Sequence, residues 1–85
     1  MELLITFPNT HSMIQSERVL KKQGITFRSM PLPTKLGDSC GFCLRLWVDD
    51  IEEGLKVLER EQIQINGVFK IENVNGKRVY SKWIN

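Results

Sequence analysis

The alternation of strand-like and helical segments is the feature that most constrains the fold of this chain. Strand-like segments are wholly apolar or alternate apolar and polar residues, whereas helical segments repeat apolar residues at 3.6-residue spacing. A chain of 85 residues has no room for a second core, so we expect a single domain, residues 1–85. The predicted segments are, in order, strand 2–7, helix 11–23, strand 25–30, strand 42–48, helix 49–62, strand 68–72 and strand 78–84.

This order predicts an α+β fold: a ferredoxin-like split βαβ sheet with two helices on one face, plus an extra C-terminal strand. Right-handed crossovers make the first two strands parallel and place the third between them, antiparallel to both. Asn75-Gly76, before the extra strand, is typical of a type I′ hairpin turn. The loop before the third strand should then lie at the same end of the sheet as the start of the first helix.

Local residue types also predict where the helices begin and end. Pro8-Asn9-Thr10 has the chemistry of a turn and cap before the first helix, and Gly24 is expected to end that helix. Asp49, followed three residues later by Glu52, predicts a capped start for the second helix.

The charge and the cysteine content limit the partners and the compartment. Twelve Lys and Arg residues against ten Asp and Glu give a net charge of +2, which is too balanced to indicate a nucleic-acid partner. Neither a signal peptide nor a membrane-spanning segment is predicted, so we expect a cytoplasmic protein with no membrane partner. Two cysteines in that compartment are expected to be reduced thiols.

The loop at residues 31–41 carries the most specific chemical signal. It contains two prolines and ends in Cys40-Gly41, so a turn should present the thiol of Cys40 near solvent. Free backbone N–H groups at the start of the first helix would favour the thiolate, which is the nucleophilic form of cysteine. The alternative is that Cys40 is a small buried apolar residue, as free cysteines often are.

Cys43 completes a C-x-x-C spacing with Cys40. Residues three apart in an extended strand are separated by roughly 10 Å, beyond the limit of about 7 Å between the Cα atoms of a disulfide. Only a turn at Cys40-Gly41 would bring the two sulfurs together. Cys43 is therefore either a resolving thiol or a residue on the helix-free face of the sheet.

His11 is the only histidine, and the topology places it near Cys40 as a possible thiol partner. The alternative is an exposed residue that starts the helix. Asn9, Thr10, Ser39 and Gly41 are expected to surround the thiol as binding residues. Cys40, Cys43 and His11 lack an evident fourth ligand for structural zinc, so we expect neither a metal nor a cofactor.

Aromatic residues mark a possible self-association surface. Trp47 and Arg45 share a strand face with Cys43, and Tyr80 and Trp83 lie in the extra hairpin. They could form the interface of a homo-oligomer. Alternatively, the hairpin could fold back and cover Trp47 within one chain.

Several of these segments together resemble one known family. They are residues 5–11, Pro31-Leu32-Pro33, Ser39-Cys40-Gly41, Leu44-Arg45 and residues 67–71. The chain is similar, over most of residues 2–72, to the small bacterial family described as "putative selenium/sulfur carrier protein-like". The resemblance implies that Cys40 holds sulfur or selenium as a persulfide or selenopersulfide.

A carrier of this kind is a shuttle more than an enzyme with its own turnover. It implies a donor protein, such as a cysteine desulfurase, and an acceptor enzyme. Two other functions fit the sequence. One is a non-catalytic regulatory or interaction module, because a ferredoxin-like fold does not fix function. The other is a dithiol redox protein that uses Cys40 and Cys43.

Overall fold

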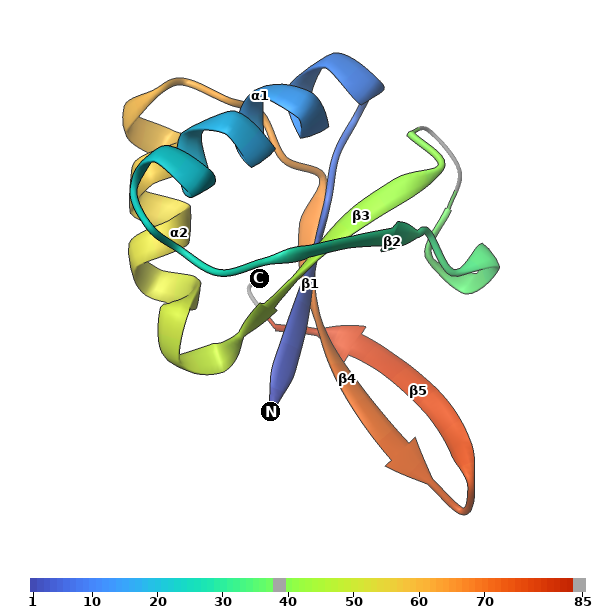
Figure 1. The fold of residues 1–85 in the computed structure, drawn as a ribbon. Helices are drawn as coiled ribbons and strands as arrows, with labels where there is room; N and C mark the ends of the chain where they lie inside the picture. Colours follow the sequence, from blue (N-terminus) through green and yellow to red (C-terminus); the bar gives the residue numbers. More distant parts are fainter. Residues whose placement is uncertain (38–39, 84–85) are drawn as a thin grey trace.

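The computed structural model describes residues 1–37 and 40–83 and has the predicted α+β architecture (Figure 1). The sheet order is β2-β3-β1-β4-β5, and each neighbouring pair is antiparallel. β1 and β2 therefore run parallel with β3 between them, as predicted. The elements are β1 (Glu2–Thr6), α1 (Thr10–Lys22), β2 (Arg28–Pro31), a short 3₁₀ turn η1 (Thr34–Leu36), β3 (Phe42–Trp47), α2 (Val48–Arg60), β4 (Gly67–Val74) and β5 (Lys77–Lys82).

Both helices lie on one side of the sheet and pack against each other and against β3 (Figure 1). β1 is central, and its residues Leu3, Leu4 and Ile5 are fully buried. Leu3 and Ile5 belong to the core cluster under the helices, which also contains Leu20 of α1 and Leu58 of α2. Because side chains alternate along a strand, Leu4 lies on the opposite, helix-free face.

The end of α1 explains why β2 is shorter than predicted. Gly24 has a φ of +74°, and the Ile25 N–H donates to the Leu20 carbonyl oxygen at 3.0 Å. This is a Schellman-type helix end, and the apolar residues Leu20 and Ile25 both belong to the buried core. Ile25 therefore completes the helix cap, and β2 begins only at Arg28, so the prediction of a strand from residue 25 was wrong in its first half.

The start of α2 also differs from the prediction. The helix begins at Val48, one residue before the predicted cap Asp49, and no side chain caps it. β3 runs directly into the helix, and the Val48 N–H donates to the Met1 carbonyl oxygen at 2.9 Å. Met1 thus supplies the partner of the first helical N–H, and the predicted Asp49/Glu52 cap was wrong.

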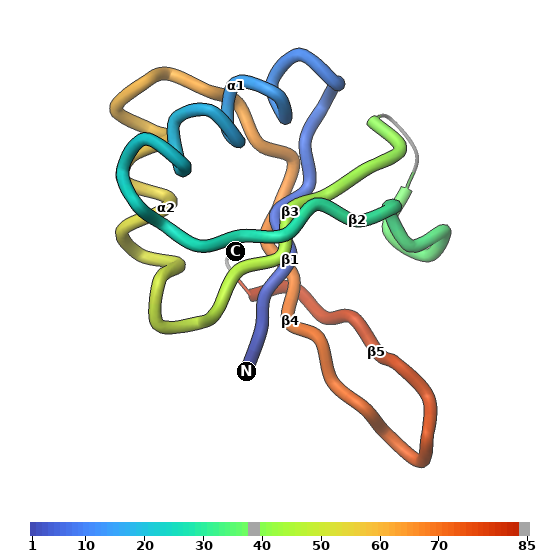
Figure 2. Tube along the Cα trace, viewed as in Figure 1, coloured from blue at the N-terminus to red at the C-terminus, as the bar shows by residue number. Residues whose placement is uncertain are grey.

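The β4–β5 hairpin extends past the rest of the sheet as an arm (Figure 2). Asn75 and Gly76 both have positive φ, 52° and 78°, which confirms the predicted type I′ turn. Trp47 keeps 52% of its surface exposed, so the idea that the hairpin covers it within one chain was wrong. Self-association through this residue stays a prediction.

The two helix ends allow a matched test of backbone strain. α2 ends like α1, but the residue with positive φ is Gln62 (φ 59°) where α1 has Gly24. A side chain in this conformation costs about 1–2 kcal/mol, partly offset by the extra freedom of glycine in the unfolded chain. Gln62→Gly should therefore raise the free energy of unfolding by roughly 0.5–1 kcal/mol.

Gly24→Ala is the matched control and should lower the free energy of unfolding by about 1 kcal/mol. A Cβ at Gly24 would meet no atom within 4 Å, so this loss would come from the backbone conformation and not from a clash. Urea denaturation of both variants measures the two changes. A destabilised Gln62→Gly protein would contradict the assignment of strain.

Candidate functional site

The loop that carries Cys40 is closed at its base by backbone contacts. Pro31 and Phe42 are opposite each other in the β2–β3 ladder, and the Leu32 N–H donates to the Gly41 carbonyl oxygen at 3.0 Å. Gly41 has a φ of +83°, which glycine adopts without strain. These features fix the backbone that follows Cys40.

Cys40 is partly exposed and packs against the edge of the core. Its Sγ lies 4.0 Å from the Sδ of Met13, in the second turn of α1. The loop and the start of α1 therefore lie at the same end of the sheet, as the topology predicted. Ser39, also predicted to line the site, lies outside the described residues.

Three more of the predicted site residues lie at the start of α1. The Asn9 Oδ1 caps the helix by accepting a hydrogen bond from the Ser12 N–H at 2.8 Å, so this side chain has a structural role. Thr10 and His11 follow and are exposed. The hydrogen bonds of the described residues include none between His11 and Cys40, and coupling between the two stays a prediction.

Cys43 differs sharply from Cys40. It lies within β3, opposite Thr6 of β1 and Met30 of β2, and is fully buried on the helix-free face. Burial raises the pKa of Cys43 from 9.0 to about 11; negative charge on Cys40 adds to this, and Arg45 opposes it. Cys43 is therefore a protonated thiol at neutral pH, out of reach of solvent, which disfavours a resolving role.

Met13 is the site residue that the sequence did not reveal. Its position on the inner face of α1 follows from helical spacing, but this pattern only predicts burial in the core. Contact with Cys40 depends on how the loop closes, 27 residues further along the chain. No local signal in the sequence predicts that approach.

The described residues, 1–37 and 40–83, lack two other kinds of feature, a metal-binding cluster and a membrane-spanning helix. In this part of the chain, no group of three or more His, Cys, Asp or Glu side chains could hold a metal ion. None of its helices has both the length and the apolar character needed to cross a membrane.

The pKa of Cys43 predicts how stability depends on pH. The unfolded chain releases this thiol proton near pH 9, but the folded chain holds it up to about pH 11. The contribution of this thiol to stability is therefore fully present below pH 9. The free energy of unfolding should then fall by roughly 2–3 kcal/mol as pH rises from 9 to 11. Urea denaturation at several pH values, with a reductant present, measures the decline.

Cys43→Ala removes this thiol and should flatten the decline, although it lowers stability below pH 9 by leaving a small cavity. Other groups that titrate above pH 9 remain in both proteins, so their effects cancel in the difference between the two curves. Parallel curves for the wild type and Cys43→Ala between pH 9 and 11 would contradict the raised pKa.

Known proteins resemble this chain over most of its length. Residues 2–70 match the family described as "Putative Se/S carrier protein-like". Among curated proteins, the chain is similar to the uncharacterised protein YtiA of Escherichia coli (strain K12), with 36% identity over 52 residues. The match covers 61% of this chain and 61% of that relative, less than two thirds of its length. No solved structure matches the chain.

Proposed function

The chain belongs to the Se/S carrier protein-like family, and from this premise we propose that it carries sulfur or selenium on Cys40. The observation that carries the proposal is the contrast between its two thiols. Cys40 is partly exposed on a loop with a fixed base, whereas Cys43 is fully buried and protonated at neutral pH. The protein would act as a shuttle and not as an enzyme with its own turnover.

Loading would be an exchange of one sulfur atom between two thiols. The Cys40 thiolate attacks the outer sulfur of a donor persulfide and forms a new S–S bond. The S–S bond of the donor breaks, and the donor cysteine leaves as a thiolate. The proton stays on the outer sulfur. Cys40 is oxidised to a persulfide while the donor persulfide is reduced to a thiolate, so no further oxidant is needed. A donor selenopersulfide would load selenium by the same step.

Unloading would reverse this pattern on a different partner. A nucleophile of the acceptor attacks the outer sulfur or selenium, and Cys40 leaves as a thiolate ready for another cycle. The partners are therefore a persulfide donor, such as a cysteine desulfurase, and an acceptor enzyme. A reducing compartment such as the cytoplasm would keep Cys40 free between cycles.

The burial of Cys43 would protect the carried atom. A thiolate at Cys43 could attack the inner sulfur of a Cys40 persulfide, form a Cys40–Cys43 disulfide and release the outer sulfur as hydrosulfide. Burial and a pKa of about 11 keep Cys43 protonated and suppress that attack. This argument favours a one-thiol carrier over the dithiol redox alternative.

Intact-mass analysis after incubation with a cysteine desulfurase and cysteine tests the proposal. The wild type should gain the mass of one sulfur atom, and dithiothreitol should remove it. Cys43→Ser should still gain it, because Cys43 takes no part in loading. Cys40→Ser should gain none.

Free cysteine persulfide serves as a second donor, since a desulfurase from another pathway could fail to dock. A mass gain that persists in Cys40→Ser would show that Cys40 is not the carrier residue. Failure of both donors to load the wild type would equally contradict the proposal.

A further inference from the structure

The thioether of Met13 lies directly against the thiol of Cys40. The Cys40 Sγ and the Met13 Sδ are 4.0 Å apart, which is van der Waals contact, and the thiol donates weakly to the thioether. Met13 is only 7% exposed and belongs to the core cluster, whereas Cys40 is partly exposed and packs against the edge of that cluster. The sulfur of Cys40 therefore has one side closed by Met13 and one side open to solvent.

The start of α1 holds Met13 in this place. The Met13 N–H donates to the Asn9 carbonyl oxygen at 3.3 Å, and the Asn9 side chain caps the same turn through the Ser12 N–H. Figure 1 shows this helix start at the same end of the sheet as the start of β3, so the capped turn lies beside the loop that carries Cys40. Met13 cannot swing away from Cys40 without leaving a cavity in the core.

A persulfide on Cys40 offers two sulfur atoms to an incoming thiolate, and the products differ. Attack on the outer sulfur transfers it: the attacker bonds to the outer sulfur, the bond to Sγ breaks, and Cys40 leaves as a thiolate. Attack on Sγ wastes the carried atom: the attacker forms a mixed disulfide with Cys40, and the outer sulfur leaves with its proton as hydrosulfide. In that second reaction the attacker is oxidised and the carried sulfur is reduced, so no further reagent is needed.

The position of Met13 discriminates between these two reactions. A thiolate attacks a divalent sulfur along the line of the S–S bond that breaks, from the side opposite the leaving atom. Because the core closes one side of Cys40, the carried atom extends toward solvent. The path to Sγ then starts on the closed side, where the Met13 Sδ already lies in contact. The outer atom stays open to attack, whereas Sγ does not.

We propose that Met13 directs thiols to the carried atom and away from Sγ, which makes it the residue that determines where the persulfide is attacked. This inference rests on the proposed carrier function and names the step that Met13 controls. A thioether fits the role because it has no ionisable proton and forms no disulfide with Cys40. The attackers concerned are the thiol of an acceptor protein and the small thiols of a reducing compartment.

A methyl disulfide on Cys40 tests the proposal without a donor protein. Methyl methanethiosulfonate transfers one CH₃S group to an accessible thiol and releases methanesulfinate, so the outer sulfur takes the place of a carried atom. 2-Mercaptoethanol is then added to the full chain, and the reaction is stopped with acid before a second exchange. Intact mass separates unmodified protein, the product of attack on the outer sulfur, from the hydroxyethyl mixed disulfide, the product of attack on Sγ. The unmodified wild type should exceed the mixed disulfide by at least about tenfold.

Variants of Met13 separate shielding from a general loss of packing. Met13→Ala opens the closed side and should raise the ratio of mixed disulfide to unmodified protein about tenfold. Met13→Val shortens the side chain with a smaller loss of core volume and should raise the ratio in the same direction, which keeps the test decisive if the alanine variant does not fold. Met13→Leu refills the space and should restore the wild-type ratio.

Ile51→Ala and Ile51→Val are the matched controls. Ile51 is 3% exposed and belongs to the same core cluster, but it lies in the first turn of α2, and α2 begins at the end of β3 away from Cys40. Both controls leave a cavity without opening the path to Sγ, so they should give the wild-type ratio. Circular dichroism confirms that each variant compared is folded.

Four results would overturn the proposal: mainly mixed disulfide from the wild type, a wild-type ratio in folded Met13→Ala or Met13→Val, an equal rise in the Ile51 variants, or failure of the reagent to label Cys40. The ratio is measured on a chemical disulfide, so it is independent of loading by a persulfide donor. A protein that shields Sγ but never loads sulfur would refute the carrier function and not the shield. A protein that loads sulfur but shows no effect of Met13 would refute the shield alone.

Discussion

The double-sided burial of β1 is the constraint on which the rest of the structure depends. Leu3 and Ile5 pack under the helices, while Leu4 is buried on the opposite face. Each such side chain contributes roughly 1.5–3 kcal/mol through burial, so β1 cannot slip against its neighbours without exposing apolar surface. Its ladder with β3 then fixes the face of every β3 side chain: Leu44 points to the helices, and Cys43 and Arg45 point away.

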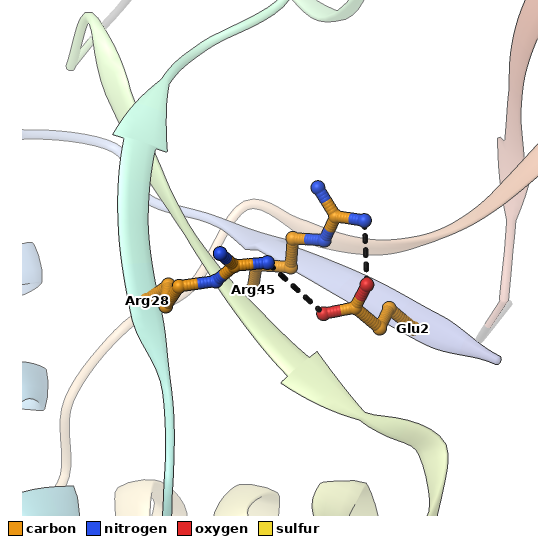
Figure 3. A network of polar contacts seen from close by, with 3 residues as sticks. All are labelled: Glu2, Arg28 and Arg45. Atoms are coloured by element: carbon orange, nitrogen blue, oxygen red, sulfur yellow. Dashed lines mark hydrogen bonds and ion pairs between the residues drawn. The ribbon is translucent and has the colours of Figure 1, made fainter.

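This register places the two thiols and the charged cluster of Glu2, Arg28 and Arg45 at different positions along β3 and the loop before it. Cys43 falls inside the ladder and is fully buried, whereas Cys40 lies in the loop just before β3, next to Gly41 with its positive φ. Further along the same face, the register brings Arg45 opposite Arg28 and next to Glu2. The position of the Cys40 loop and the ion pairs of Glu2 (Figure 3) thus both follow from how β3 is placed beside β1.

Much of the fold could be predicted because its determinants are local. Helical spacing, strand alternation and Asn75-Gly76 are all visible in short windows of sequence, and the handedness of crossovers then orders the strands. One error arose where a distant group intervened, and the other arose at the local end of a helix. Val48 starts α2 because its N–H meets Met1, and Ile25 completes a helix cap instead of a strand. Phe42 lies on the same face of β3 as Leu44 yet is 48% exposed, because sequence periodicity does not say how far the helices cover a strand.

The site could be predicted only in part for the same reason. The loop with Cys40 and its end of the sheet followed from residue types and topology. The contact with Met13, the burial of Cys43 and the Glu2 cluster did not, because each joins residues that are far apart in sequence. Taken singly, Glu2, Arg28 and Arg45 look like ordinary solvated charges.

Sequential alkylation of the native and then the unfolded protein tests the central claim most directly, namely that the fold leaves one thiol reactive and withholds the other. Light iodoacetamide is added to the folded chain at neutral pH, and isotopically heavy iodoacetamide is added after denaturation. Peptide mass analysis then reads the label on each cysteine. We expect Cys40 to carry the light label and Cys43 the heavy label. As much light label on Cys43 as on Cys40, or heavy label on both cysteines, would contradict the account.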